Sequence, residues 1–237
     1  MIIHSLADNL RKQNWFTVFI EFIIVVVGIF VALQVDDWKE GVKDKQEEQQ
    51  VLNRLIRDLQ TDQATITEIQ NFYVEHLAEL TVQQEIIFQD TLSEDDIEQV
   101  MYYSGANIKE LNPRTTTYSE IINTGKLYKL SNIDLVEQII DYYRLIDNII
   151  YHNRQTRNEF RALFYGPELT EKWYWVIHTD NKKYAREFFS NNRTKSYKTL
   201  MQTAGWSVSI INSRIAWNDA ILAQNKALIE MISQLTE

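Results

Sequence analysis

An uninterrupted apolar stretch dominates the beginning of the chain. Trp15 to Val35 comprises 21 residues, and no polar side chain occurs between Phe22 and Leu33. As an α-helix, 21 residues would extend roughly 31 Å, the thickness of the hydrocarbon core of a bilayer. Its Val and Ile content alone suits a strand, but its length favours a helix. The pattern therefore predicts a transmembrane helix over residues 15–35.

One carboxylate, Glu21, interrupts this apolar stretch. Fourteen Phe, Ile, Val and Leu residues lie between Phe16 and Leu33. At roughly −0.4 kcal/mol each they supply on the order of −5 to −6 kcal/mol, against at most about +3 kcal/mol for a carboxylate at mid-membrane. Insertion is therefore favoured. The stretch is longer than the core of a signal peptide and lacks a small-residue cleavage site, so we expect an uncleaved anchor.

The flanks of this helix predict its anchoring but not its orientation. Trp15 and Trp38 bracket it, where amphipathic rings favour the headgroup region. Basic residues occur on both sides, so their distribution does not decide which end is cytoplasmic. They are Arg11 and Lys12 before the helix and Lys39, Lys43 and Lys45 after it. We expect a short tail over residues 1–14 and a soluble domain over residues 36–237.

The soluble domain has the pattern of long amphipathic helices. The whole chain contains only six glycines and two prolines, so few residues break its helices. Apolar residues recur at three- and four-residue steps in three stretches, from about residue 39 to 90, 131 to 165 and 197 to 235. The predicted fold class is all-α, with one N-terminal transmembrane helix followed by a long-helix antiparallel bundle domain.

Local signals predict several helix ends. Ser93 suits the cap of a short acidic helix, and Ser131 with Asp134 resembles a capping box. Gly125 suits the left-handed residue that follows a helix. The segment KWYWVIH, residues 172–178, is either extended or a short aromatic helix.

The last predicted helix has two asparagines in its apolar row. Asn218 and Asn225 stand seven residues apart, and a second apolar row widens this face. A face this wide indicates a bundle of three or more helices rather than a two-stranded coiled coil. Buried amides need partners and usually fix the register between helices at some cost in stability. Contact with a ligand is the alternative role.

Charge and composition limit the classes of molecule that the chain is expected to bind. The formal net charge is −9, whereas the residues up to Gln34 sum to zero, so the acidity belongs to the soluble domain. This argues against binding to nucleic acid or to an anionic lipid surface. The chain has no cysteine, which excludes disulfides and thiolate metal sites.

No motif for catalysis is evident. The chain lacks a Gly-x-Ser-x-Gly elbow and a Gly-rich phosphate loop. The four histidines show no paired metal-ligand spacing; they are His4, His76, His152 and His178. Arg154, Arg157 and Arg161 lie on one side of their helix and either bind an anion or pair with acidic residues nearby. Those acidic residues are Asp58, Asp62, Glu68 and Glu75. We expect no catalytic residue, metal or cofactor.

Two stretches resemble a known family. IEFIIVVVGIFVALQVDDWKE is similar to the N-terminal signature of an uncharacterised family of single-pass bacterial membrane proteins, a domain of unknown function. Asp36 and Asp37 depart from its usual asparagines. The matching residues are Glu21, Gly28, Ala32, Leu33, Gln34 and Trp38. In TTYSEIINTGKLYKLSN the matching residues are Thr117, Tyr118, Gly125 and Leu127, with Thr124 in place of serine. The resemblance implies the bacterial inner membrane and a periplasmic C-terminal domain.

Glu21, Val25, Gly28 and Ala32 would share one face of the transmembrane helix. Gly28-x-x-x-Ala32 is a small-xxx-small pattern that lets two membrane helices approach closely. Glu21 could hydrogen-bond across such an interface, snorkel to the headgroups, or carry protons or cations. The favoured function is a non-enzymatic interaction or scaffold subunit that assembles with itself or with a larger membrane complex. The alternatives are a homo-oligomeric channel that uses Glu21 and a sensor with a polar pocket near Asn218, Asn225 and Tyr118.

Overall fold

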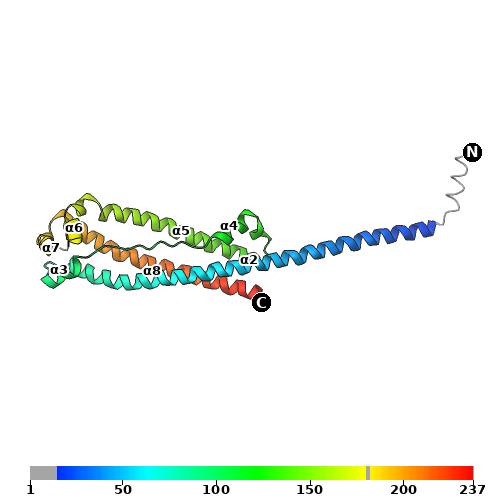
Figure 1. The fold of residues 1–237 in the computed structure, drawn as a ribbon, viewed down its shortest axis with the longest axis horizontal. Helices are drawn as coiled ribbons and strands as arrows, with labels where there is room; N and C mark the ends of the chain where they lie inside the picture. Colours follow the sequence, from blue (N-terminus) through cyan, green and yellow to red (C-terminus); the bar gives the residue numbers. More distant parts are fainter. Residues whose placement is uncertain (1–14, 180–181, 237) are drawn as a thin grey trace, which may run out of the picture. The chain divides into compact units, whose positions relative to one another are not determined.

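The computed structural model describes residues 15–179 and 182–236, and every regular element in this part of the chain is a helix (Figure 1). This confirms the all-α fold class. The elements in chain order are α2 (Trp15–Ile87), α3 (Glu94–Val100), α4 (Thr116–Asn123), the 3₁₀ helix η1 (Lys126–Lys129), α5 (Ile133–Phe164), α6 (Pro167–Thr179), α7 (Lys182–Phe189) and α8 (Lys195–Thr236).

The contacts within the chain divide it into two units. The first unit ends at Val51 and the second comprises Leu52–Glu237, so α2 contributes to both. In the first unit, nearly all side chains from Phe16 to Val35 are exposed. Helix α2 is the one helix in the described residues that is long and apolar enough to cross a membrane. The boundaries proposed from the sequence for the tail, the transmembrane helix and the soluble domain stay predictions.

Helices α2 and α8 run antiparallel in the second unit. Near one end, the Asn225 side chain of α8 donates to the carbonyl oxygen of Leu59 in α2 (3.0 Å). Near the other end, the Tyr197 hydroxyl of α8 donates to the carbonyl oxygen of Ile87 (2.8 Å). The residue number rises along α2 as it falls along α8, which defines the antiparallel register.

Helix α5 is also antiparallel to α8. The Asn225 side chain donates to the Tyr142 hydroxyl (2.9 Å), and the rings of Phe160 and Trp206 lie 5.8 Å apart. The long-helix antiparallel bundle is thereby confirmed. Because α2 and α5 are both antiparallel to α8, they run parallel to each other, and the chain between them must return along the length of the bundle.

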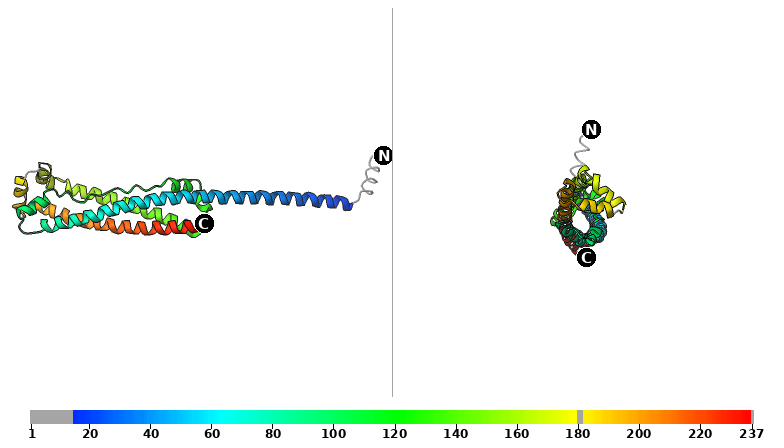
Figure 2. Two further views of the ribbon diagram at one scale, coloured as in Figure 1. Left: turned by 60° about the horizontal axis from the view of Figure 1, so that its bottom comes forward. Right: turned by 90° about the vertical axis from the view of Figure 1, so that its left-hand side faces the viewer.

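An extended stretch, residues 103–115, makes this return, and we call it the return segment. Figure 2 shows it running along the helices from α3 to α4. Thirteen extended residues reach roughly 43 Å, close to the roughly 48 Å of the 32-residue helix α5. The return segment thus takes the place of the second helix in an up-down-up-down bundle.

Side chains of α2 bind the backbone of the return segment. The Tyr73 hydroxyl donates to the carbonyl oxygen of Lys109 (3.1 Å), and the backbone N–H of Asn107 donates to Nε2 of His76 (3.2 Å). An extended chain has no internal hydrogen bonds to satisfy its backbone, so a position beside helices requires such partners. The α2 side chains therefore supply part of the hydrogen bonding that the extended backbone lacks.

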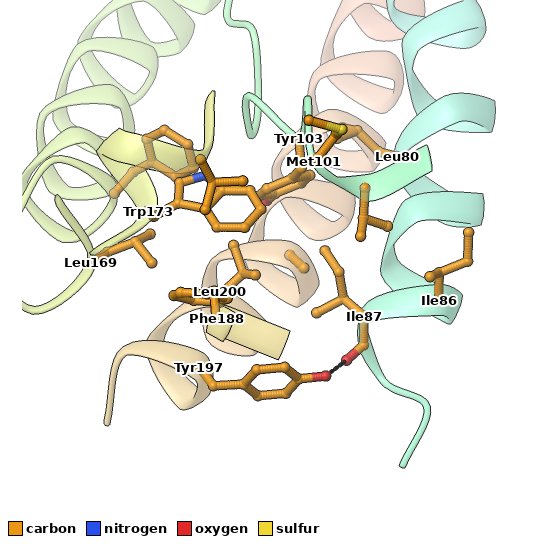
Figure 3. Packing of buried hydrophobic residues seen from close by; sticks show 14 of the residues in the cluster. Leu80, Ile86, Ile87, Met101, Tyr103, Leu169, Trp173, Phe188, Tyr197 and Leu200 are labelled. Atoms are coloured by element: carbon orange, nitrogen blue, oxygen red, sulfur yellow. Dashed lines mark hydrogen bonds between the residues drawn. The ribbon is translucent and has the colours of Figure 1, made fainter. Parts of the chain in front are cut away.

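Helices α3, α6 and α7 enclose one end of the bundle with a hydrophobic core (Figure 3). Trp173 of α6 is 2% exposed, and its ring lies 5.0 Å from that of Phe188 in α7. Leu169 and Leu200, both fully buried, pack into the same cluster. This packing holds α6 and α7 against α8.

The observed helix ends can be compared with the caps that were predicted from the sequence. Ser93 caps α3 and Gly125 is left-handed with φ 70°, as predicted, and Asp96 completes a capping box with Ser93. The capping role of Ser131 is wrong: Asn132, whose Oδ1 accepts from the N–H of Leu135 (3.0 Å), caps α5. KWYWVIH is helical within α6, so its extended alternative is wrong.

Candidate functional site

The packing face that was proposed from the sequence for a membrane helix falls on α2. Glu21, Val25, Gly28 and Ala32 fall within its helical part, at the spacing that places them on one side. All four are exposed, and a Cβ built on Gly28 would meet no atom within 4 Å. The face therefore has room for a second helix to approach at Gly28.

The two predicted interface tryptophans differ in what can be described. Trp38 is 69% exposed on α2, as a headgroup anchor requires. Trp15 begins α2, but its side chain lies outside the described residues, as does the predicted tail over residues 1–14. Anchoring by either ring stays a prediction.

Asn225 joins all three long helices. Its Nδ2 donates both to the carbonyl oxygen of Leu59 in α2 and to the hydroxyl of Tyr142 in α5, while its Oδ1 is buried without a partner. Asn218 is also buried, but its Nδ2 has no partner. Both asparagines are thus buried, and the hydrogen bonds of Asn225 link the three long helices. A role of either amide in setting the register of the bundle stays a prediction.

An acidic pair of α2 holds the end of the return segment and the start of α4. Asp62, 2% exposed, accepts from the backbone N–H of Arg114 (2.9 Å), and Asp58 accepts from the Thr117 hydroxyl (2.5 Å). Burial raises the pKa of Asp62, although the hydrogen bond from Arg114 opposes this. The Tyr143 hydroxyl donates to the Arg114 carbonyl oxygen (3.3 Å), so α2 and α5 both hold this peptide.

The arginine row of α5 lies beside the return segment. Arg157 pairs with Glu110, and together with Arg154 it lines a small hollow of about 60 Å³ next to that segment. Arg161 lies over the ring of Tyr165, with 5.7 Å between the guanidinium carbon and the ring centroid. Two of these three arginines are thus engaged by neighbours of the same chain.

The histidines do not come together in the described residues. His76 accepts from the backbone of Asn107, whereas the His152 ring lies 6.1 Å from that of Trp217. His4 and the side chain of His178 lie outside the described residues. Within residues 15–179 and 182–236, no group of three or more His, Asp or Glu residues could hold a metal ion.

Arg214 of α8 is only 2% exposed, although it was not among the residues expected from the sequence to form a site. A signal for it was available. Arg214 stands four residues after Ile210 and seven before Ile221, both in the second apolar row of this helix. A charged residue at such a position faces the core, where charges are rare unless paired.

The described residues define a class of protein. It is all-α, with an exposed apolar helical segment long enough to cross a membrane and a helical bundle that buries several polar side chains. The chain belongs to DUF6090, a family of unknown function, which matches residues 21–163. The match begins at Glu21 and ends one residue before the end of α5. A comparison with curated proteins found no match, and neither did a comparison with solved structures.

Proposed function

We propose that this protein is a non-enzymatic, membrane-anchored accessory subunit, an interaction or scaffold protein whose bundle assembles with itself or with a larger membrane complex. The observation that carries the proposal is the exposed apolar surface of α2 between Phe16 and Val35. Soluble monomers rarely expose large continuous apolar patches, because the hydrophobic effect disfavours their contact with water. Lipid, together with other membrane helices, would cover this surface.

The packing face gives the anchor a second role. Small residues at Gly28 and Ala32 let a second helix approach closely, and a carboxylate in a membrane helix favours a partner with which it can hydrogen-bond. The exposure of Glu21, Val25, Gly28 and Ala32 supports this role. The proposal places the anchor in a bacterial inner membrane with the bundle in the periplasm, and this placement rests on the family signature alone.

The test uses the full-length chain extracted from bacterial membranes with a mild detergent. We expect a membrane-bound protein that elutes as an oligomer or with co-purifying membrane proteins. Gly28→Leu and Glu21→Gln should each reduce the assembled fraction, because they block close approach and remove the carboxylate. Phe30 lies on the opposite side of the helix from this face. Phe30→Leu is therefore the matched control and should leave assembly unchanged.

Three outcomes would count against the proposal. A chain that remains in the aqueous fraction after cell lysis would refute the anchor. Assembly that is unaltered in both Gly28→Leu and Glu21→Gln would refute the packing face. Proton or cation flux into vesicles that Glu21→Gln abolishes would favour a channel over a scaffold.

A further inference from the structure

A hollow of about 150 Å³ opens between α5 and α8. Its lining combines hydroxyl groups, two indole rings and one guanidinium. It includes Thr156 of α5 and Trp206, Ser209, Ser213, Arg214 and Trp217 of α8. Both tryptophans are partly buried, so their rings belong to the wall rather than to the free surface.

Arg214 is the unusual member of this lining, because its charge is buried without a counter-charge. The side chain is 2% exposed, and neither Nε nor Nη2 has a hydrogen-bond partner. Burial lowers its pKa to about 10, which leaves it protonated at neutral pH, and no carboxylate acts on that pKa among the described residues. A buried, unpaired charge is costly to a fold, so a missing partner is the simplest reason for its position.

The two unpartnered atoms form one edge of the guanidinium. Nε–H and Nη2–H point the same way and match the spacing of two oxygens on a carboxylate or a phosphate. Both atoms are buried, so an anion in the hollow would reach this edge only after the side chains around Arg214 shift. Trp217 lies over the guanidinium, with 4.6 Å between its carbon and the ring centroid, and Tyr73 of α2 acts on the charge of Arg214. The contact with Trp217 holds the guanidinium plane at the hollow.

We propose that this hollow binds a small organic anion, with a carboxylate or phosphate group on Arg214 and a flat apolar body against Trp206 and Trp217. The hydroxyls of Thr156, Ser209 and Ser213 would supply further polar contacts. The α8 part of this lining falls outside the stretch that matches the family, residues 21–163. The site is independent of the proposed membrane anchor.

The experiment titrates full-length protein in non-ionic detergent with two probes, benzoate and phenyl phosphate, by calorimetry and thermal unfolding. We expect saturable binding of at least one probe below about 10 mM and a rise in Tm with probe concentration. The probe that binds more tightly identifies the anionic group. Arg214→Met should weaken binding at least about tenfold, and Arg214→Lys, which keeps the charge but loses the planar edge, should weaken it less.

A second variant tests the hollow without removing the charge. Ser213 is exposed, so Ser213→Phe should fold normally while filling the hollow and abolishing binding. Arg154→Met, which removes an exposed arginine from a different hollow, is the matched control and should bind as the wild type does. The proposal is overturned if neither probe binds saturably, or if Arg214→Met and Ser213→Phe both bind like the wild type.

Discussion

Gly105 occupies a backbone position in the return segment that other residues would strain. Its φ is +74°, and a Cβ there would lie 2.7 Å from Cζ of Phe160 in α5. Gly105→Ala should therefore lower the free energy of unfolding by about 2–4 kcal/mol, through backbone strain and the displaced ring. Chemical denaturation of the full chain in non-ionic detergent measures this change.

A second glycine supplies the matched control for Gly105. Gly205 lies within α8, and a Cβ there would make ordinary contacts at 3.5 Å with Gln84 and 3.6 Å with Phe88. Gly205→Ala should raise the free energy of unfolding by about 0.5–1 kcal/mol, since alanine loses less entropy in a helix. Equal effects of the two substitutions would show that the conformation of Gly105 is not the cause.

Asn225 and Tyr142 form a buried hydrogen bond whose energy can be isolated. Asn225→Leu leaves the Tyr142 hydroxyl without its donor, so we expect the free energy of unfolding to fall by about 1–3 kcal/mol. Adding Tyr142→Phe removes the orphaned hydroxyl and should recover part of that loss. A double-mutant cycle from denaturation data should give a coupling energy of about 0.5–3 kcal/mol, and strict additivity would contradict it.

The return segment depends on Asp62 for the attachment of its last residues. Burial raises the pKa of Asp62 in the folded chain. The folded chain therefore holds the proton of the Asp62 carboxyl group more tightly than the unfolded chain does. Protonation of Asp62 therefore stabilises the folded chain. This contribution is complete below the ordinary aspartate pKa of about 3.9 and is lost as pH rises through the raised pKa of Asp62. Asp62→Asn keeps an acceptor for Arg114 but does not titrate. Its stability relative to wild type should therefore increase with pH across this window, measured by denaturation at several pH values; a constant difference would contradict the prediction.

The sequence predicted the long helices because three- and four-residue periods report a buried face directly. It did not predict the return segment as a bundle member, since its position depends on distant side chains such as Tyr73 and His76. The cap of α5 was misplaced because Ser131 and Asn132 are both suitable caps, and only the backbone shows which one is used.

The candidate sites were harder to predict than the helices. The packing face proposed for α2 rests on helical spacing alone, so its residues could be named from the sequence, and their role stays a prediction. The partner of Asn225 could not be named, because Leu59 and Tyr142 reach it only through the register of three helices. Arg214 had a sequence signal in its apolar row, but its unpaired edge and its hollow exist only in the packed bundle.

At the scale of the whole molecule, the two units differ in what stabilises them. The main hydrophobic cluster, which includes Tyr73, Trp173 and Tyr197, lies entirely within Leu52–Glu237. The exposed apolar surface of α2 lies in the first unit. The bundle should therefore fold without the apolar stretch, whereas the full chain should need lipid or detergent.

A fragment of residues 46–237 tests this division. It retains the described bundle and lacks the apolar stretch, so we expect it to remain in aqueous buffer without detergent and to unfold in one cooperative transition. Its Tm should lie within about 5 °C of that of the full chain in detergent, because the removed residues do not contribute to the hydrophobic cluster. The full chain in the same detergent-free buffer is the control and should aggregate. If the fragment is unfolded instead, the apolar stretch stabilises the bundle directly, and its exposure would no longer point to lipid.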